Sequence, residues 1–161
     1  MARSTFVYVT YIRTTPEKLW SALTTDVEFM KQYWFGVHCE SEWTAGSAWR
    51  MVQRDGTITD DGEILAAEPP RRLVIRWRHR KRPELEAEGD SLCIMELEPS
   101  GTAVKLSITH TIEREPSQLM GAVSGGWPKI LSNLKSLLET GSLVLHDPYP
   151  AAGADPGKAS S

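Results

Sequence analysis

The sequence predicts an α+β fold in which a curved antiparallel sheet packs against a long C-terminal helix. Residues 37–110 contain short strand-like segments separated by turn signals, a spacing typical of an antiparallel meander. Residues 127–141 instead place apolar side chains three or four positions apart, which indicates a helix with one buried stripe. A helix laid on a curved sheet leaves room on the concave side, so a ligand cavity is expected there.

Size and composition set the next expectations. The 161 residues, 40% of them hydrophobic, fit one domain over residues 1–145, followed by a tail over residues 146–161 whose composition predicts disorder. No apolar run reaches the roughly 20 residues that a membrane span needs, and we find no signal segment, so a cytoplasmic protein is expected. The net charge of -3 argues against nucleic acid as a partner.

Metal and redox chemistry find little support in the sequence. Cys39 and Cys93 are the two cysteines, and no CxxC spacing or His-Glu helical pair accompanies them. We therefore expect two free thiols, no metal site and no cofactor.

The N-terminal region predicts one strand and two short helices. Residues 6–13 are rich in β-branched and aromatic side chains, which favour a strand. Thr15 can cap a first helix with Pro16 at its first position, and Asp26 can cap a second helix over residues 27–33.

The central region predicts strands with one apolar face. Residues 73–80, 93–98 and 104–110 alternate apolar and polar side chains. In the strand around Trp49, a shift by one position would turn Arg50 inward instead. Turns between the strands are predicted at Ala45-Gly46, Asp55-Gly56, Asp60-Asp61-Gly62, Pro69-Pro70, Glu88-Gly89-Asp90 and Pro99-Ser100-Gly101.

A basic cluster lies in the same region. Its members are Arg71, Arg72, Arg76, Arg78, Arg80, Lys81 and Arg82. Because acidic residues follow directly at positions 84–90, we interpret the cluster as a solvated strand face and hairpin loop. An anionic ligand or partner is the alternative.

The final helix has recognisable ends. Pro128 suits the first helical turn, and Gly141 can take the left-handed conformation that ends a helix. The glycines between Gly121 and Gly126 are expected to form a bend at the helix entrance, which could open to a ligand.

Several segments, taken in order, carry a resemblance to a known family. They are Thr15-Pro16-Glu17-Lys18-Leu19-Trp20, Gly62-Glu63-Ile64-Leu65, Pro69-Pro70-Arg71-Arg72-Leu73, Gly126-Trp127, Leu134-Lys135 and Leu138-Glu139-Thr140-Gly141. With them the chain resembles the bacterial Activator of Hsp90 ATPase homologue-like family of the START-like, or SRPBCC, superfamily. The resemblance implies a helix-grip fold. Members of the superfamily bind lipids, hormones or polyketides, or act as cyclases, so it implies less about activity.

Candidate site residues follow from the predicted concave face. Trp49, Trp77 and Trp127 could supply aromatic contacts, with Met51 and Met95 as adaptable walls. His79 and His110 end inward-facing alternations, where an imidazole could anchor a ligand or move a proton. The helix positions Ile130 and Leu131 complete the predicted binding set. Core packing is the alternative for the tryptophans and methionines, and a backbone-bonded structural role is the alternative for the histidines.

These observations lead to one favoured function and two alternatives. We expect a non-catalytic protein that binds a small hydrophobic or amphipathic molecule between the sheet and the final helix. The first alternative is a polyketide cyclase- or dehydratase-like enzyme that uses a pocket histidine as general acid or base. The second is a protein-interaction or chaperone-associated module. Exposed sheet edges also allow a homodimer.

Overall fold

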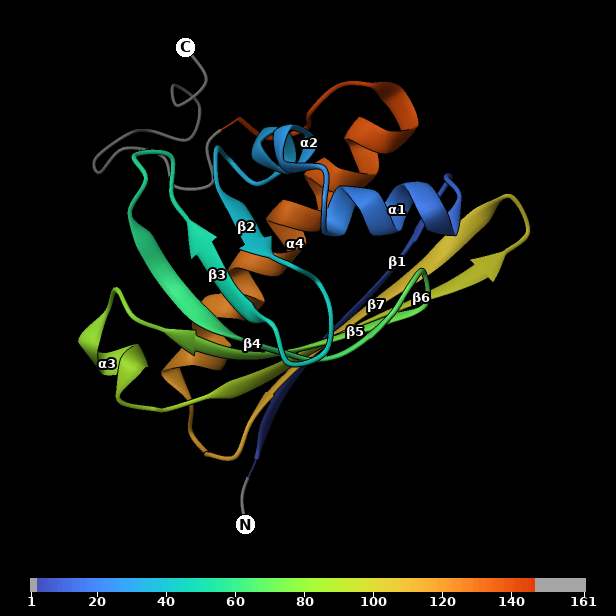
Figure 1. Ribbon diagram of the computed structural model, residues 1–161. Helices are drawn as coiled ribbons and strands as arrows, with labels where there is room; N and C mark the ends of the chain where they lie inside the picture. Colours follow the sequence, from blue (N-terminus) through green and yellow to red (C-terminus); the bar gives the residue numbers. More distant parts are fainter. Residues whose placement is uncertain (1–2, 147–161) are drawn as a thin grey trace.

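The computed structural model describes residues 3–146 of the chain (Figure 1). Most of the tail predicted from residue 146 onward therefore lies outside the described residues. Within them the elements follow one another as β1 (Ser4–Ile12), α1 (Pro16–Leu23), α2 (Val27–Tyr33), β2 (His38–Ser41), β3 (Ala48–Val52), β4 (Ile58–Glu68), β5 (Arg72–His79), α3 (Pro83–Glu86), β6 (Ser91–Ser100), β7 (Ala103–Ile112) and α4 (Gln118–Thr140).

The strands form one seven-stranded antiparallel sheet in the order β1-β7-β6-β5-β4-β3-β2. The sheet curves around α4, and α1 and α2 lie near the C-terminal part of that helix (Figure 1). The predicted α+β architecture is confirmed, with the long helix on the concave face. Among residues 3–146, none of the helices is long and apolar enough to cross a membrane.

Both short N-terminal helices begin where the sequence predicts. The side chain of Thr15 accepts a hydrogen bond from the Lys18 amide, and that of Asp26 accepts one from the Phe29 amide. These bonds satisfy amide groups that have no partner within a first helical turn.

The inward faces of the strands form the hydrophobic core. Leu73, Ile75 and Trp77 of β5 are buried, as the alternation predicts. Trp49 is also buried while Arg50 is exposed, which settles the register of β3.

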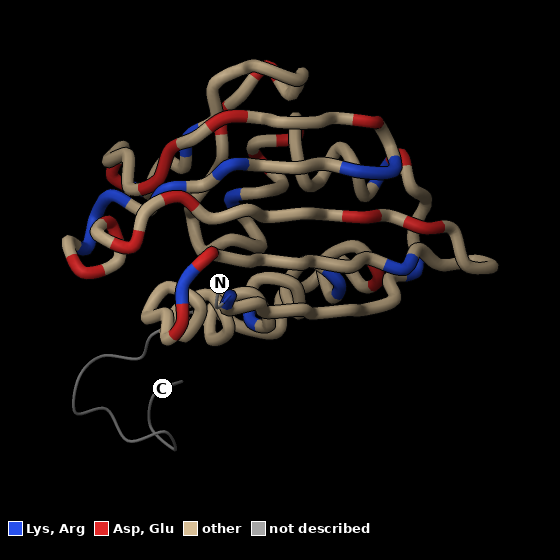
Figure 2. Tube along the Cα trace, turned by 90° about the horizontal axis from the view of Figure 1, so that it is seen from below, with Lys and Arg blue, Asp and Glu red and all other residues tan. Residues whose placement is uncertain are grey.

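Most arginines of the basic cluster form salt bridges on the outer face of the sheet. Arg76 lies 3.1 Å from Glu63 and 3.3 Å from Asp90, and Arg80 lies 3.0 Å from Asp61. Seen from below the sheet, basic and acidic positions lie side by side on neighbouring strands (Figure 2). The interpretation of this strand face as a solvated surface agrees with these pairs.

The turn predicted at Asp60-Asp61-Gly62 is wrong, because these residues lie inside β4. Gly62 is opposite Trp77 of β5, and a Cβ atom at this position would overlap the carbonyl oxygen of Arg76. The glycine thus serves a close approach of two strands and does not mark a turn.

Two helix predictions also need correction. The expected hairpin loop after β5 contains the short helix α3, which has Pro83 at its first position and buries Leu85. The long helix α4 begins at Gln118, so Pro128 lies in its interior and the expected glycine bend is helical. Ser117 caps this start by accepting a hydrogen bond from the Met120 amide. Gly141 ends the helix with a positive φ, as predicted.

A carboxylate from a distant loop completes the start of α4. Glu88 accepts hydrogen bonds from the Ser117 hydroxyl at 2.6 Å and from the amides of Gln118 and Leu119 at 2.7 and 3.4 Å. Burial raises the pKa of the Glu88 carboxyl, but these hydrogen bonds and the nearby Arg114 charge outweigh burial and hold the pKa below its usual range. The loop after α3 is thereby fastened to α4.

We predict that Glu88→Gln lowers the free energy of unfolding at pH 7 by about 1 kcal/mol, because a charged cap at a helix N-terminus is lost. Because the pKa of Glu88 is lower in the folded than in the unfolded state, its carboxylate stabilises the fold at pH values above the unfolded pKa of about 4.3. This stabilisation is lost as the pH falls through the folded pKa. Urea unfolding across this range should therefore show the variant and wild type converging at low pH. Glu84→Gln, on the exposed side of α3, is the control. A loss of unfolding free energy in Glu88→Gln that stays constant with pH would contradict the role of the Glu88 charge.

Candidate functional site: a pocket between the sheet and α4

An aromatic cluster holds α4 against the sheet. The ring of Trp127 lies 5.6 Å from that of Trp34, at the end of α2, and 5.9 Å from that of Trp77 on β5. Trp77 in turn lies 4.5 Å from Trp49 on β3. Distances in this range are typical of favourable aromatic pairs, so the cluster joins three parts of the fold.

His110 on β7 lies beneath this cluster and is saturated with hydrogen bonds. The indole nitrogen of Trp127 donates to its Nδ1 atom at 3.2 Å. Nε2 therefore carries the proton and faces the Ser91 hydroxyl at 2.8 Å, and that hydroxyl donates to the Trp77 carbonyl. Burial lowers the pKa of His110 to about 4, against a smaller opposing effect of Asp60. The neutral imidazole is thus a fixed part of the core at neutral pH.

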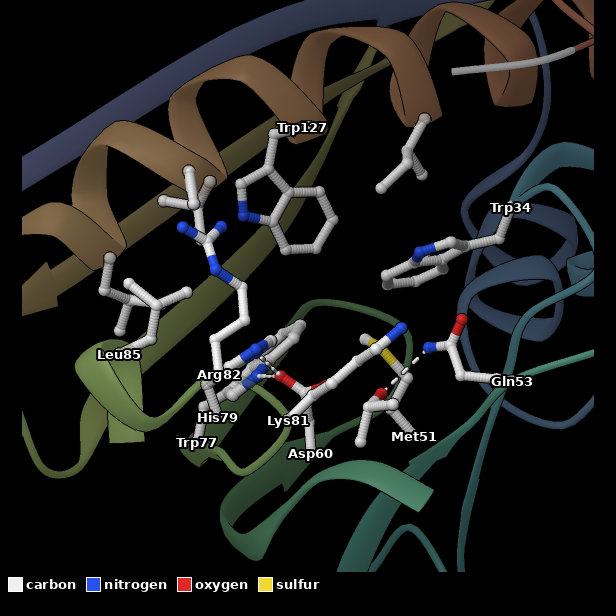
Figure 3. A pocket seen from close by; sticks show the side chains of 16 residues that line it. Trp34, Met51, Gln53, Asp60, Trp77, His79, Lys81, Arg82, Leu85 and Trp127 are labelled. Atoms are coloured by element: carbon white, nitrogen blue, oxygen red, sulfur yellow. Dashed lines mark hydrogen bonds and ion pairs between the residues drawn. The ribbon is translucent and has the colours of Figure 1, made fainter. Parts of the chain in front are cut away.

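Beside the cluster lies a pocket with a volume of about 360 Å³. Two tryptophans line it from opposite sides, Trp127 from α4 and Trp77 from the sheet (Figure 3). Its other apolar walls include Trp34, Met51, Leu85, Leu119, Val123 and Ile130 (Figure 3). Its polar lining consists of Gln53, Thr59, Asp60, His79, Lys81 and Arg82. Apolar walls with a few convergent polar groups are the usual make-up of a small-molecule site.

The polar centre of the pocket is a buried carboxylate with two neighbours. Asp60 Oδ2 accepts a hydrogen bond from the Trp77 indole at 2.7 Å and lies 2.9 Å from His79 Nδ1 (Figure 3). Asp60 and His79 are direct partners in the β4–β5 register. Because a carboxylate only accepts, His79 holds its proton on Nδ1, and its Nε2 atom is left as an acceptor when the ring is neutral. This buried Nε2 has no hydrogen-bond partner among the described residues.

Gly126 provides much of the space under α4. The pocket-lining positions of the helix are three or four residues apart: Leu119, Ala122, Val123, Gly126, Trp127 and Ile130. Gly126 lies in the middle of this face, and a Cβ atom there would meet no atom within 4 Å. Gly125 has equally open surroundings but is exposed and does not line the pocket. The glycine at 126 therefore keeps a wall position empty.

The structure distributes the predicted site residues over two layers. Met51, Trp77, His79, Trp127 and Ile130 line the pocket. Trp49, Met95, His110 and Leu131 lie in the buried core next to it and are absent from its lining.

Sequence reasoning missed several polar lining residues. Asp60 stands in an Asp-Asp-Gly run that resembles a turn. The available signal is that a strand continuing through this run pairs Asp60 with the inward His79. In sequence, Lys81 and Arg82 belong to the basic cluster, and only their position just past the last inward residue, His79, distinguishes them from its other members.

The cysteines and acidic residues suggest no further chemistry in this part of the chain. Burial raises the pKa values of Cys39 and Cys93, so both thiols stay protonated. No group of His, Cys, Asp or Glu within residues 3–146 could hold a metal ion.

We predict that Asp60→Ala lowers the free energy of unfolding by about 1–3 kcal/mol, because the buried Trp77 indole loses its acceptor. The neighbouring Asp61→Ala removes an exposed salt bridge to Arg80 and should cost at most about 1 kcal/mol. Urea unfolding of both variants provides the comparison. Equal losses of unfolding free energy in the two variants would show that the buried contacts of Asp60 stabilise the fold no more than an exposed salt bridge does.

Comparison with known proteins finds a matching family and solved structures of similar fold. The family model described as Activator of Hsp90 ATPase homolog 1-like protein matches residues 13–139. No match is found among curated proteins. Among solved structures, a crystal structure of a Mesorhizobium loti protein has 25% sequence identity and a TM-score of 0.72, covering 87% of this chain and 100% of that one.

Two further structures are similar in fold. The solution structure of the Aha1 dimer from Colwellia psychrerythraea has 21% identity and a TM-score of 0.69, with 86% of this chain and 98% of that one covered. The crystal structure of an HSP90 activator from Plasmodium falciparum has 20% identity and a TM-score of 0.67, with 83% and 95% covered. The family model spans most of the chain, and the chain therefore belongs to the Activator of Hsp90 ATPase homolog 1-like family.

Proposed function

We propose that this protein binds a small amphipathic molecule in the pocket between the sheet and α4. The observation that carries the proposal is the joining, in one pocket, of aromatic walls and the buried Asp60–His79 pair. A volume of about 360 Å³ lies within the range of sites for small organic ligands.

The walls favour a flat or branched apolar body. Trp34 and Trp127 project into the pocket from α2 and α4, and Met51 lies below them (Figure 3). Indole rings provide a large apolar surface with little conformational freedom to lose, and a thioether adapts to irregular shapes. Apolar burial would therefore supply most of the affinity.

The polar pair favours a ligand that also carries a hydrogen-bonding group. His79 Nε2 is a buried acceptor without a partner among residues 3–146, a state that costs free energy until a donor reaches it. Asp60 holds the ring through Nδ1, so this acceptor has a fixed direction. A ligand hydroxyl or amide could meet it once a small shift of the pocket walls uncovers this nitrogen.

We predict that Gly126→Phe weakens binding of the neutral fluorescent probe phenylnaphthylamine at least tenfold, because the new ring fills the pocket from the middle of the α4 face. Gly125→Phe, on the exposed side of the same helix, should change the affinity less than twofold. Fluorescence titration measures both, and urea unfolding checks that both variants fold. Equal affinities in the two variants, or no binding to wild type, would contradict the proposed pocket.

Acid–base catalysis is a second candidate, favoured by the same pair. In its neutral form, His79 is oriented by Asp60 and has an Nε2 lone pair without a partner among the described residues, which is the arrangement of a general base. His110, with both nitrogens engaged, lacks it.

We predict that, if the pocket is catalytic, it will accelerate the elimination of nitrobenzisoxazole. His79 Nε2 would take the ring C–H proton, the C–H electron pair would complete a nitrile, and the N–O bond would break with its electron pair on oxygen, giving one product, a cyano-nitrophenolate. His79→Gln should lower the rate at least tenfold, whereas His38→Gln, outside the pocket, should not. A wild-type rate equal to that of His79→Gln, measured by absorbance, would rule this role out.

The remaining alternatives stay predictions. A homodimer and a chaperone-associated role are supported here by family membership and by the descriptions of the Colwellia and Plasmodium structures, which apply to those proteins. The cytoplasmic location is likewise a prediction from the sequence.

A further inference from the structure

Two cationic side chains enter the pocket from the segment between β5 and α3. Lys81 extends across the pocket toward the side of Trp34, and Arg82 reaches up toward α4 (Figure 3). Arg80 separates them from the inward His79, and both are exposed, which places them at the mouth of an otherwise largely apolar site.

Lys81 differs from the neighbouring basic residues in having no close acidic partner. Arg76, Arg78 and Arg80 each form a salt bridge with a carboxylate on the outer face. Lys81 forms no hydrogen bond or salt bridge with any residue between 3 and 146, and its charge acts on Asp55 through a longer-range interaction. The salt bridges that neutralise the basic residues of the outer face therefore do not extend to Lys81 in the pocket.

Arg82 has only a weak competing partner. Its guanidinium lies 3.4 Å from Glu84, and both side chains are about half exposed, at 55% and 44%. Exposed pairs of this kind hold together loosely and exchange readily for a better partner.

The one carboxylate among the described lining residues is already engaged. Asp60 is 4% exposed, and its Oδ2 atom serves both Trp77 and His79. No salt bridge joins it to Lys81 among the described contacts. The mouth of the pocket therefore presents positive charge, although the whole chain has a net charge of -3.

We propose that the amphipathic molecule bound in this pocket is an anion, with its acidic group held by Lys81 and Arg82. This inference rests on the proposed function. The apolar body lies on Trp34 and Trp127, and the charged group lies at the α3 side of the mouth. Low-dielectric walls strengthen the attraction of a site for charge at its entrance, and a guanidinium suits a carboxylate, sulfonate or phosphate group in particular.

Two related probes test the charge requirement. Anilinonaphthalene sulfonate carries a sulfonate that phenylnaphthylamine lacks, while the two share the same aromatic body. The double variant Lys81→Gln/Arg82→Gln should weaken sulfonate-probe binding at least tenfold, which corresponds to about 1.4 kcal/mol, and should change neutral-probe binding less than twofold.

A matched double variant controls for net charge. Arg71→Gln/Lys105→Gln also removes two positive charges, but at the opposite end of β5. It should leave both probes within twofold of wild type. An equal loss of sulfonate-probe affinity in the two double variants, or no loss in either, would overturn the inference.

The result with the neutral probe separates the two proposals. If it binds and Gly126→Phe abolishes its binding, but Lys81→Gln/Arg82→Gln leaves the sulfonate probe unaffected, the anion inference is wrong and the pocket stands. If neither probe responds to Gly126→Phe, the pocket itself is wrong as a binding site.

Discussion

The position of Trp127 decides where α4 lies. Its ring packs between Trp34 and Trp77, and its indole nitrogen donates to His110 on β7. The hydrogen bond requires a neutral imidazole with a free Nδ1 lone pair, and burial of His110 keeps it in that form. Farther along α4, the buried Asn133 accepts hydrogen bonds from the amides of residues 144 and 145 and donates to the carbonyl of 145. At the start of the helix Glu88 provides the corresponding attachment.

The pocket follows from this fixed helix. Because Trp127 and the capped first turn hold α4 on either side of Gly126, the missing side chain at this position leaves space that the helix cannot close by moving inward. Two histidines on the same concave face then have opposite properties. His110 uses both nitrogens within the core, while His79 uses one on Asp60 and keeps the other free of protein partners within the described chain. Environment, more than residue type, separates the structural histidine from the one available to a ligand.

Local patterns predicted the parts of the fold that depend on local physics. Alternation identified the inward faces of the strands, including Trp77 and His79, and capping residues identified α1, α2 and the end of α4. The failures depended on tertiary contacts. Asp60 and Gly62 resemble a turn in sequence, yet both lie in a strand. Asp60 accepts a hydrogen bond from Trp77, and Gly62 allows the backbone of Arg76 to approach closely. The start of α4 relies on Ser117 and on Glu88, which lies 29 residues earlier, and such a pairing leaves no periodic signal. Lys81 and Arg82 line the pocket because the segment between β5 and α3 runs along it, and no periodic pattern marks that path.

The proposed function puts a small amphipathic molecule in the space beside Gly126. Native mass spectrometry of gently purified wild-type protein and of Gly126→Phe tests it most directly, since any retained molecule can be released and identified. We expect a stoichiometric small-molecule adduct on the wild type that is missing from the variant. A ligand-free wild type, or an adduct that persists at full occupancy in Gly126→Phe, would contradict it.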